Sequence, residues 1–215
     1  TFFSDINYLN NIFSIIKQKF SNEYIILDIE TTGLNPEKHD PIEIAMCIVD
    51  TQRCKDVSSN ECNIIFSQNT LLCPTYTTCI KLDAGRWEIA DVEALNVNGF
   101  NSDCIWNGLE LADASLSMSK FLIDNNIRKE NAVFICQNPS FDRMFFHKVI
   151  SYDFYLKENM PSHWLDLGSL FLGSIINNHF YQGNEFKIFS KDEIADEIGL
   201  PSEEKPHKAL NGVKH

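Results

Sequence analysis

The sequence predicts an α/β fold, in which helices pack on a sheet whose early strands meander. Short, continuous apolar runs at 24–27 and 132–136 are typical of buried strands. Longer segments, such as 109–127, repeat apolar residues at helical spacing. The expected order is three strands, a helix, a strand and then three helices, which favours an α/β sheet.

The N-terminal segment, residues 1–22, predicts an amphipathic helix. Its apolar residues recur at helical spacing behind Ser4, a suitable N-cap. We expect this helix to pack on the core of one domain that comprises residues 23–215. No repeat, low-complexity tract or linker divides that domain.

The remaining elements are expected in the following order. Strands are predicted at 24–27, 42–49 and 63–66, and the first should be buried on both faces. Residues 68–107 are irregular and predict short pieces and a surface loop. Helices are predicted at 109–127, 141–149, 164–176 and 190–198, with a strand at 132–136. In the last helix, Ser190 and Glu193 have capping-box spacing, and Gly199 marks the end.

The composition excludes several classes of protein. Apolar residues make up 44% and charged residues 22%, which is ordinary for a globular chain and excludes disorder. No segment approaches the roughly 20 apolar residues of a membrane span, and no signal peptide is expected. The seven cysteines are odd in number and lack Cys-x-x-Cys spacing, which indicates free thiols and a cytoplasmic location.

The net charge points away from bulk attraction to polyanions. Lys and Arg number 18 against 30 Asp and Glu, which gives −12. Such a chain should not coat nucleic acid or anionic membranes. Nucleic acid would have to be engaged at a local site.

Two carboxylates follow the first predicted strand. Asp28 and Glu30 are two residues apart, so their side chains share one face of the strand. Hard oxygen ligands of this kind suit Mg²⁺ or Mn²⁺. Gly33, in the turn that follows, permits a positive φ or a close backbone approach. The structural alternative is an ordinary strand end with a polar turn.

The segment Asp28-Ile-Glu-Thr-Thr-Gly-Leu34 resembles the first motif of the DEDD 3′–5′ exonucleases, which have a ribonuclease-H-like mixed sheet flanked by helices. Ile42-Glu43-Ile44 continues the resemblance on the second strand. Asn138-Pro-Ser-Phe-Asp142 resembles the second motif, after a strand and at the start of a helix. For Asp142, the structural alternative is a first-turn carboxylate that faces the helix N-terminus.

The third motif is incomplete. His207-Lys-Ala-Leu210 resembles the beginning of His-x-Ala-x-x-Asp, the signature of the histidine-containing subgroup, but Gly212 stands where the fourth acid is expected. Three explanations for Gly212 stay open. The residue was altered to trap an inactive form, another acid fills the space of the missing one, or the protein has lost strong catalysis and kept binding. The resemblance covers residues 24–212.

The resemblance implies a site with two Mg²⁺ or Mn²⁺ ions. Asp28 would bridge both ions, Glu30 would hold the ion that binds the attacking water, and Asp142 would hold the other. His207 would act as general base, since an unperturbed pKa of about 6.5 suits that task. Gly212 then predicts weaker binding of the water-activating ion and reduced activity.

The same resemblance implies the residues that bind substrate. These are Thr32, Gly33, Leu34, Asn138 and Phe141. For the three phenylalanines at 141, 145 and 146, we expect at least two to pack in the core. The lysines at 187, 191, 205 and 208 are interleaved with acids and predict a solvated face.

The expected function is hydrolysis of phosphodiester bonds at the 3′ ends of short or single-stranded DNA or RNA. The alternative is a catalytically degenerate, exonuclease-like module that binds nucleic acid or protein. No membrane partner is expected, and the sequence identifies no protein partner.

Overall fold

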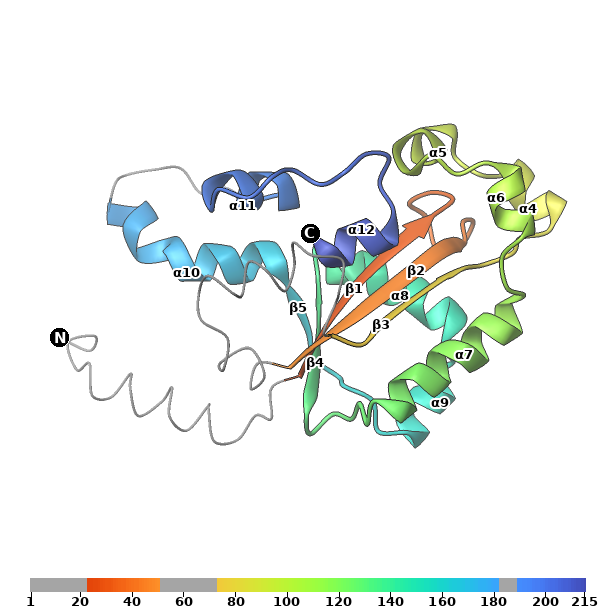
Figure 1. Ribbon diagram of the computed structural model, residues 1–215, viewed down its shortest axis with the longest axis horizontal. Helices are drawn as coiled ribbons and strands as arrows, with labels where there is room; N and C mark the ends of the chain where they lie inside the picture. Colours follow the sequence, from red (N-terminus) through yellow and green to blue (C-terminus); the bar gives the residue numbers. More distant parts are fainter. Residues whose placement is uncertain (1–22, 51–72, 182–188) are drawn as a thin grey trace.

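The computed structural model describes residues 23–50, 73–181 and 189–215 (Figure 1). Its described strands form one five-stranded sheet in the order β3-β2-β1-β4-β5. Their bounds are Glu23–Thr31 for β1, Pro41–Asp50 for β2, Thr75–Cys79 for β3, Ala132–Cys136 for β4 and Trp164–Asp166 for β5. The β1–β2 and β2–β3 pairs are antiparallel, and the β1–β4 and β4–β5 pairs are parallel. The prediction of a mixed sheet flanked by helices is therefore confirmed.

Helices occupy the connections between strands. Between β3 and β4 lie α4 (Ala84–Glu88), α5 (Val92–Asn98), α6 (Ser102–Trp106) and α7 (Leu111–Asp124). Between β4 and β5 lie α8 (Pro139–Val149) and α9 (Tyr152–Lys157), and after β5 come α10 (Leu167–Tyr181), α11 (Lys191–Glu197) and α12 (Ala209–Lys214). No helix within the described ranges is long and apolar enough to cross a membrane.

The central strand β1 presents two different faces. Ile25, Leu27 and Ile29 are buried, whereas Asp28 and Glu30 alternate with them and stay half-buried. The buried set joins the main core, which includes residues of α7 and α8. Burial on both faces, predicted for residues 24–27, is met only in part, because Tyr24 and Ile26 on the second face are half-buried and Ile26 packs against the apolar cluster at α12.

The second face of the sheet is covered by α12. Ala45 and Cys47 of β2 pack there against Ala209 and Val213 in a small apolar cluster. Figure 1 shows α12 lying along β1 and β2, with α8 behind the strands. The C-terminal helix thus lies over the half of the sheet that carries the acids.

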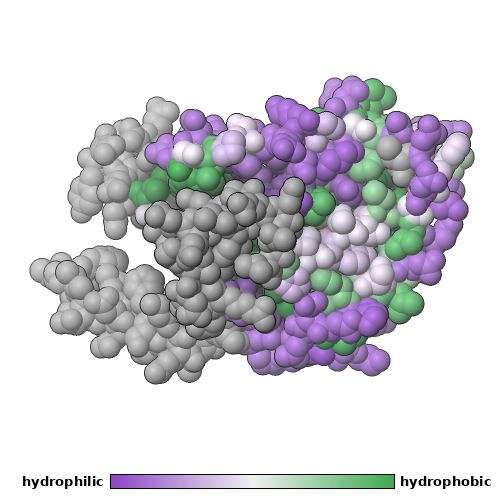
Figure 2. Space-filling model, viewed as in Figure 1, coloured by the Kyte–Doolittle hydropathy of each residue, from purple (hydrophilic) through white to green (hydrophobic). Residues whose placement is uncertain are grey.

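Polar side chains surround the visible face of the molecule. Figure 2 shows hydrophilic residues along much of the rim and a paler stretch in the middle of the described surface. This stretch lies where Figure 1 places β2 and β3. The edge of the sheet formed by β3 is therefore less polar than the rim around it.

Several sequence predictions are met, and others are corrected. The capping box of Ser190 and Glu193 is present, and Gly199 has a φ of 75°. The short pieces expected within residues 73–107 are the strand β3 and the short helices α4, α5 and α6, whereas α9 and α12 were not predicted. The predicted helix at 164–176 begins at Leu167, where Asp166 Oδ2 accepts from the Ser169 N–H at 2.8 Å. The predicted N-terminal helix, the strand at 63–66 and Lys187 lie outside the described residues.

Candidate active site

The three acids of the first and second motifs meet at one end of the sheet. Asp28 and Glu30 lie near the end of β1, and Asp142 lies in the first turn of α8, directly after β4. Because β1 and β4 are parallel, their carboxyl ends share an edge. The Ile29 backbone also hydrogen-bonds the Asp142 carboxylate. The fold therefore brings together the acids that the sequence singled out.

Burial and mutual repulsion make these carboxylates unusual. Burial, reinforced by Glu203 and opposed by Lys191, raises the pKa of Asp28 to about 6. Burial, followed by repulsion from Asp28, raises the pKa of Glu30 to about 7. Burial and then Asp28 also raise the pKa of Asp142 well above its ordinary value. Like charges in a desolvated site favour protonation, so a bound cation would relieve the cluster.

A fourth carboxylate ties the C-terminal helix to the sheet. Glu43 faces Glu30 across the β1–β2 ladder, and its Oε2 accepts from the Ala209 N–H at 2.7 Å. Burial raises the pKa of Glu43, while the bond from Ala209 opposes the shift. Glu43 therefore fixes the start of α12 close to the acids.

Lys191 lies inside the acidic cluster, contrary to the prediction of a solvated face. Its Nζ is 3.5 Å from Asp28 Oδ1 and 3.1 Å from Glu203 Oε2, and its side chain is only 18% exposed. Burial opposes the charged form, but Asp28 and Glu203 raise the pKa of Lys191 above its ordinary value. The cluster thus contains one permanent positive charge.

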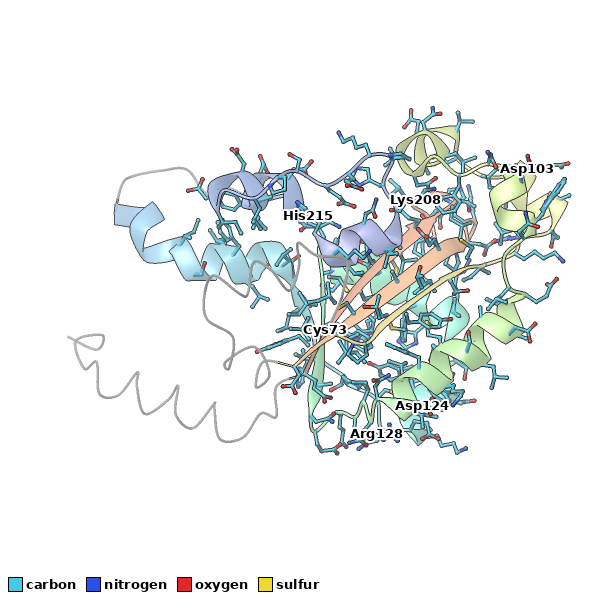
Figure 3. All side chains as sticks on the ribbon, viewed as in Figure 1. Cys73, Asp103, Asp124, Arg128, Lys208 and His215 are labelled. Carbon is cyan, nitrogen blue, oxygen red and sulfur yellow. The ribbon has the colours of Figure 1, made fainter. Side chains whose placement is uncertain are left out.

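Lys208 is also engaged rather than solvated. Its Nζ donates to the Asn98 carbonyl at 2.8 Å and lies 3.3 Å from the centroid of the Phe100 ring. In Figure 3, Lys208 and His215 mark opposite ends of α12. These contacts link the segment before α12 to the region around α5.

Gly212 faces the position of the acids, as the motif spacing implies. A Cβ at this residue would lie 1.9 Å from Asp28 Oδ2 and 2.9 Å from Lys191 Nζ. The space next to Gly212 is therefore filled by the Asp28 carboxylate and the Lys191 ammonium. Glu203 lies on the far side of Lys191, so an additional acid is present near this space but does not occupy it.

His207 is held next to Glu203. Its Nδ1 is 3.4 Å from Glu203 Oε1, and its side chain is 32% exposed. Its backbone N–H donates to the Val97 carbonyl at 3.2 Å. This arrangement turns one ring nitrogen toward a buried carboxylate and leaves Nε2 for another partner.

The loop after β1 is tightly fixed except at Leu34. Thr32 is fully buried, and its Oγ1 accepts from the Asp40 N–H at 2.9 Å. Gly33 has a φ of 155°, and the His39 ring lies where a Cβ would be. Leu34 is 76% exposed and projects from this loop. Of the predicted loop residues, Leu34 has the side chain best placed to meet a ligand.

The remaining predicted binding residues lie at the start of α8. Asn138 is exposed, and its Oδ1 accepts from Ser140 Oγ at 2.6 Å. Phe141 is half-buried, with its ring 4.8 Å from that of Phe145. Phe145 and Phe146 are fully buried, which confirms the prediction that two of the three phenylalanines pack in the core.

The donor set suits a divalent cation by its chemistry. Asp28, Glu30 and Asp142 provide hard carboxylate oxygens that repel one another in a buried setting. Within the described ranges, no three His, Cys, Asp or Glu side chains converge as a ready ligand set. Lys191 already supplies one charge between Asp28 and Glu203.

Comparison with known proteins supplies structural relatives only. No family model matches the chain, and no curated protein matches its sequence. A product-bound exonuclease I superposes with a TM-score of 0.59 and 11% identity, covering 90% of this chain and 42% of the other. Cell-death related nuclease 4 (CRN-4) gives a TM-score of 0.59 and 15% identity, covering 91% and 60%. A zinc-bound complex of E. coli exonuclease I with single-stranded DNA gives 0.59 and 13%, covering 89% and 38%.

These likenesses establish the fold. The described sheet order and flanking helices match the ribonuclease-H-like α/β fold of these exonucleases. This chain spans less than half of exonuclease I and 60% of CRN-4. The fold prediction made from the motifs is therefore confirmed.

Proposed function

We propose that this chain is a 3′–5′ exonuclease of the histidine-containing DEDD type, acting on short or single-stranded nucleic acid. The observation that carries the proposal is the meeting of three motifs at one edge of the sheet. Asp28, Asp142 and Gly212, one from each motif, lie around a single carboxylate cluster. The similar fold of exonuclease I, solved with single-stranded DNA, supports the choice of substrate.

Asp28, Glu30 and Asp142 would hold Mg²⁺ or Mn²⁺, and the family resemblance implies two ions. When bound, such ions polarise a phosphoryl oxygen and lower the pKa of a water molecule. The carboxylates hold the charge that such cations need at the end of β1. Cations bound by these carboxylates would attract a phosphate at this one place only, because the chain as a whole is strongly acidic.

His207 would remove the proton from the attacking water at Nε2. Glu203 lies 3.4 Å from Nδ1, where it would orient the ring. Leu34, exposed beyond the acids, would contact the terminal nucleotide through its apolar side chain. A cytoplasmic location stays a prediction from the cysteine content.

The second candidate is a binding module that cuts poorly. Gly212 supplies no carboxylate, and Lys191 lies where the resemblance expects the fourth acid to reach. A site altered in this way would still present Leu34 and the loop after β1 to a strand end. This candidate predicts binding without efficient cleavage.

The deciding experiment is degradation of 5′-labelled single-stranded DNA and RNA in Mg²⁺, in Mn²⁺ and in EDTA. We expect a ladder that shortens from the 3′ end only when metal is present. Asp142→Asn should remove the ladder, whereas Asp153→Asn, in the exposed first turn of α9, should not. Strand binding without a ladder would favour the binding module. The absence of both binding and cleavage would contradict both candidates.

A further inference from the structure

Lys191 is placed in the acidic cluster by a well-defined helix start. Ser190 caps α11, since its Oγ accepts from the Glu193 N–H while the Glu193 side chain accepts from the Ser190 N–H. Lys191 is therefore the first residue of the helix. From there its ammonium reaches Asp28 on one side and Glu203 on the other. Lys191 is therefore held by two carboxylates and is not a solvated surface lysine.

Glu203 is held as firmly as the lysine that it contacts. Its side chain is 2% exposed, and its backbone N–H donates to Asp192 Oδ1 at 2.9 Å. Its Oε2 contacts Lys191, while Oε1 accepts no hydrogen bond and faces His207 at 3.4 Å. A buried carboxylate in this position needs a neighbouring cation. Lys191 is that cation in the described structure.

Gly212 makes room for this arrangement. Any side chain at 212 would start 1.9 Å from Asp28 Oδ2 and 2.9 Å from Lys191 Nζ. Where the resemblance expects a fourth acid, this chain has Gly212, and the ammonium of Lys191 lies in the space next to it.

The position of Lys191 leaves less space for a second divalent ion. Its ammonium lies 3.5 Å from Asp28 Oδ1 and 3.1 Å from Glu203 Oε2, and it also borders the space next to Gly212. An ion bound to Asp28 Oδ1 would sit about 2 Å from that oxygen. On the side of Lys191, such an ion would meet strong repulsion from the ammonium.

We propose that Lys191 is a built-in cation that takes the place of one of the two divalent ions, with Glu203 as its second anionic partner. The site then binds one divalent ion per chain, held by the carboxylates away from Lys191. This inference rests on the proposed function, because it concerns the same carboxylates. It assigns Lys191 and Glu203 roles in charge compensation and positioning.

The test is the number of Mn²⁺ ions bound per chain, measured by titration with detection of free Mn²⁺ by electron paramagnetic resonance. The unaltered chain should bind one ion. Lys191→Met removes the charge but keeps most of the side-chain volume, and it should bind two ions. Lys191→Arg keeps the charge and should bind one. Lys214→Met, at an exposed position in α12, is the matched control and should also bind one.

Two ions on the unaltered chain would overturn the inference and leave the proposed function standing. One ion on Lys191→Met, with its circular dichroism spectrum unchanged, would also overturn it. If Lys191→Met does not fold, the numbers of Mn²⁺ ions bound by the unaltered chain and by Lys191→Arg still test the inference, which requires one ion on each. No Mn²⁺ on any form would contradict both this inference and the metal dependence of the proposed function.

Discussion

Replacing Gly212 by alanine tests whether α12 is closed against the acids. Alanine is favoured over glycine in a helix by about 1 kcal/mol. At Gly173 in α10, an added Cβ has no neighbour within 4 Å, so Gly173→Ala should show this gain. At Gly212 the Cβ would lie 1.9 Å from Asp28 Oδ2, and such overpacking costs about 1–3 kcal/mol. We therefore expect Gly212→Ala to be less stable than Gly173→Ala by about 1–3 kcal/mol.

The assay is urea denaturation in EDTA, followed by circular dichroism, with equal m-values as the condition for comparison. If both variants gain the same stability, the close approach of Gly212 to Asp28 is refuted. The same crowding bears on Gly212→Asp. With Lys191 in place, that carboxylate has no room, so the single substitution should not restore the activity expected of a complete motif.

Three further predictions follow from the structure. The pKa values of Asp28 and Glu30 rise from 3.8 to about 6 and from 4.5 to about 7, so between about pH 4 and pH 7 the folded chain binds more protons than the unfolded chain. In EDTA the free energy of unfolding should therefore fall as the pH rises through that window. Saturating Mn²⁺ should reduce this loss of stability. A denaturation midpoint that rises from pH 5 to pH 8 in EDTA would contradict the prediction. Ser190→Ala removes the N-cap of α11 and should cost about 1 kcal/mol of stability, measured by urea denaturation; no loss would show that the cap contributes little. Leu34→Ala should weaken binding of a single-stranded oligonucleotide about fivefold by fluorescence anisotropy, equivalent to about 1 kcal/mol. Leu116→Ala, at a position that is 70% exposed against 76% for Leu34, should leave binding unchanged.

The sequence was informative where local patterns determine structure. The β4 strand has the same bounds as its apolar run at 132–136, and the α11 cap follows from the spacing of Ser190 and Glu193. The motif acids could be placed together because strand ends in a parallel pair share one edge. These features depend on residues that are close in sequence or on a general rule of topology.

The missed elements were too short or too weakly patterned. The β5 strand has three residues, which is too few for a periodic pattern, and β3 is a Thr-rich segment without an apolar run. The six-residue α12 contains Gly212, which lowers helix propensity. Their tertiary neighbours, rather than their own sequences, determine these elements.

Lys191 and Glu203 were missed for a different reason. Both stand among alternating acids and lysines, and charge alternation alone indicates a solvated face. Which lysine turns inward depends on the opening beside Gly212 and on the carboxylate of Asp28, both distant in sequence. The one local signal was the capping box, which fixes where Lys191 begins its helix.

The hydrogen bond between Glu43 and the Ala209 N–H has a consequence for the order in which the molecule is built. It joins residues 166 positions apart, and contacts of such long range form slowly and late in folding. During synthesis, β1 and β4 leave the ribosome well before α11 and α12. The nascent chain therefore carries its acidic residues for some time without the lysine that neutralises them or the helix that covers them. Asp28 and Glu30 are therefore made before Lys191, the cation that contacts Asp28, and the cluster takes its described form only when α11 and α12 have folded onto the rest of the chain.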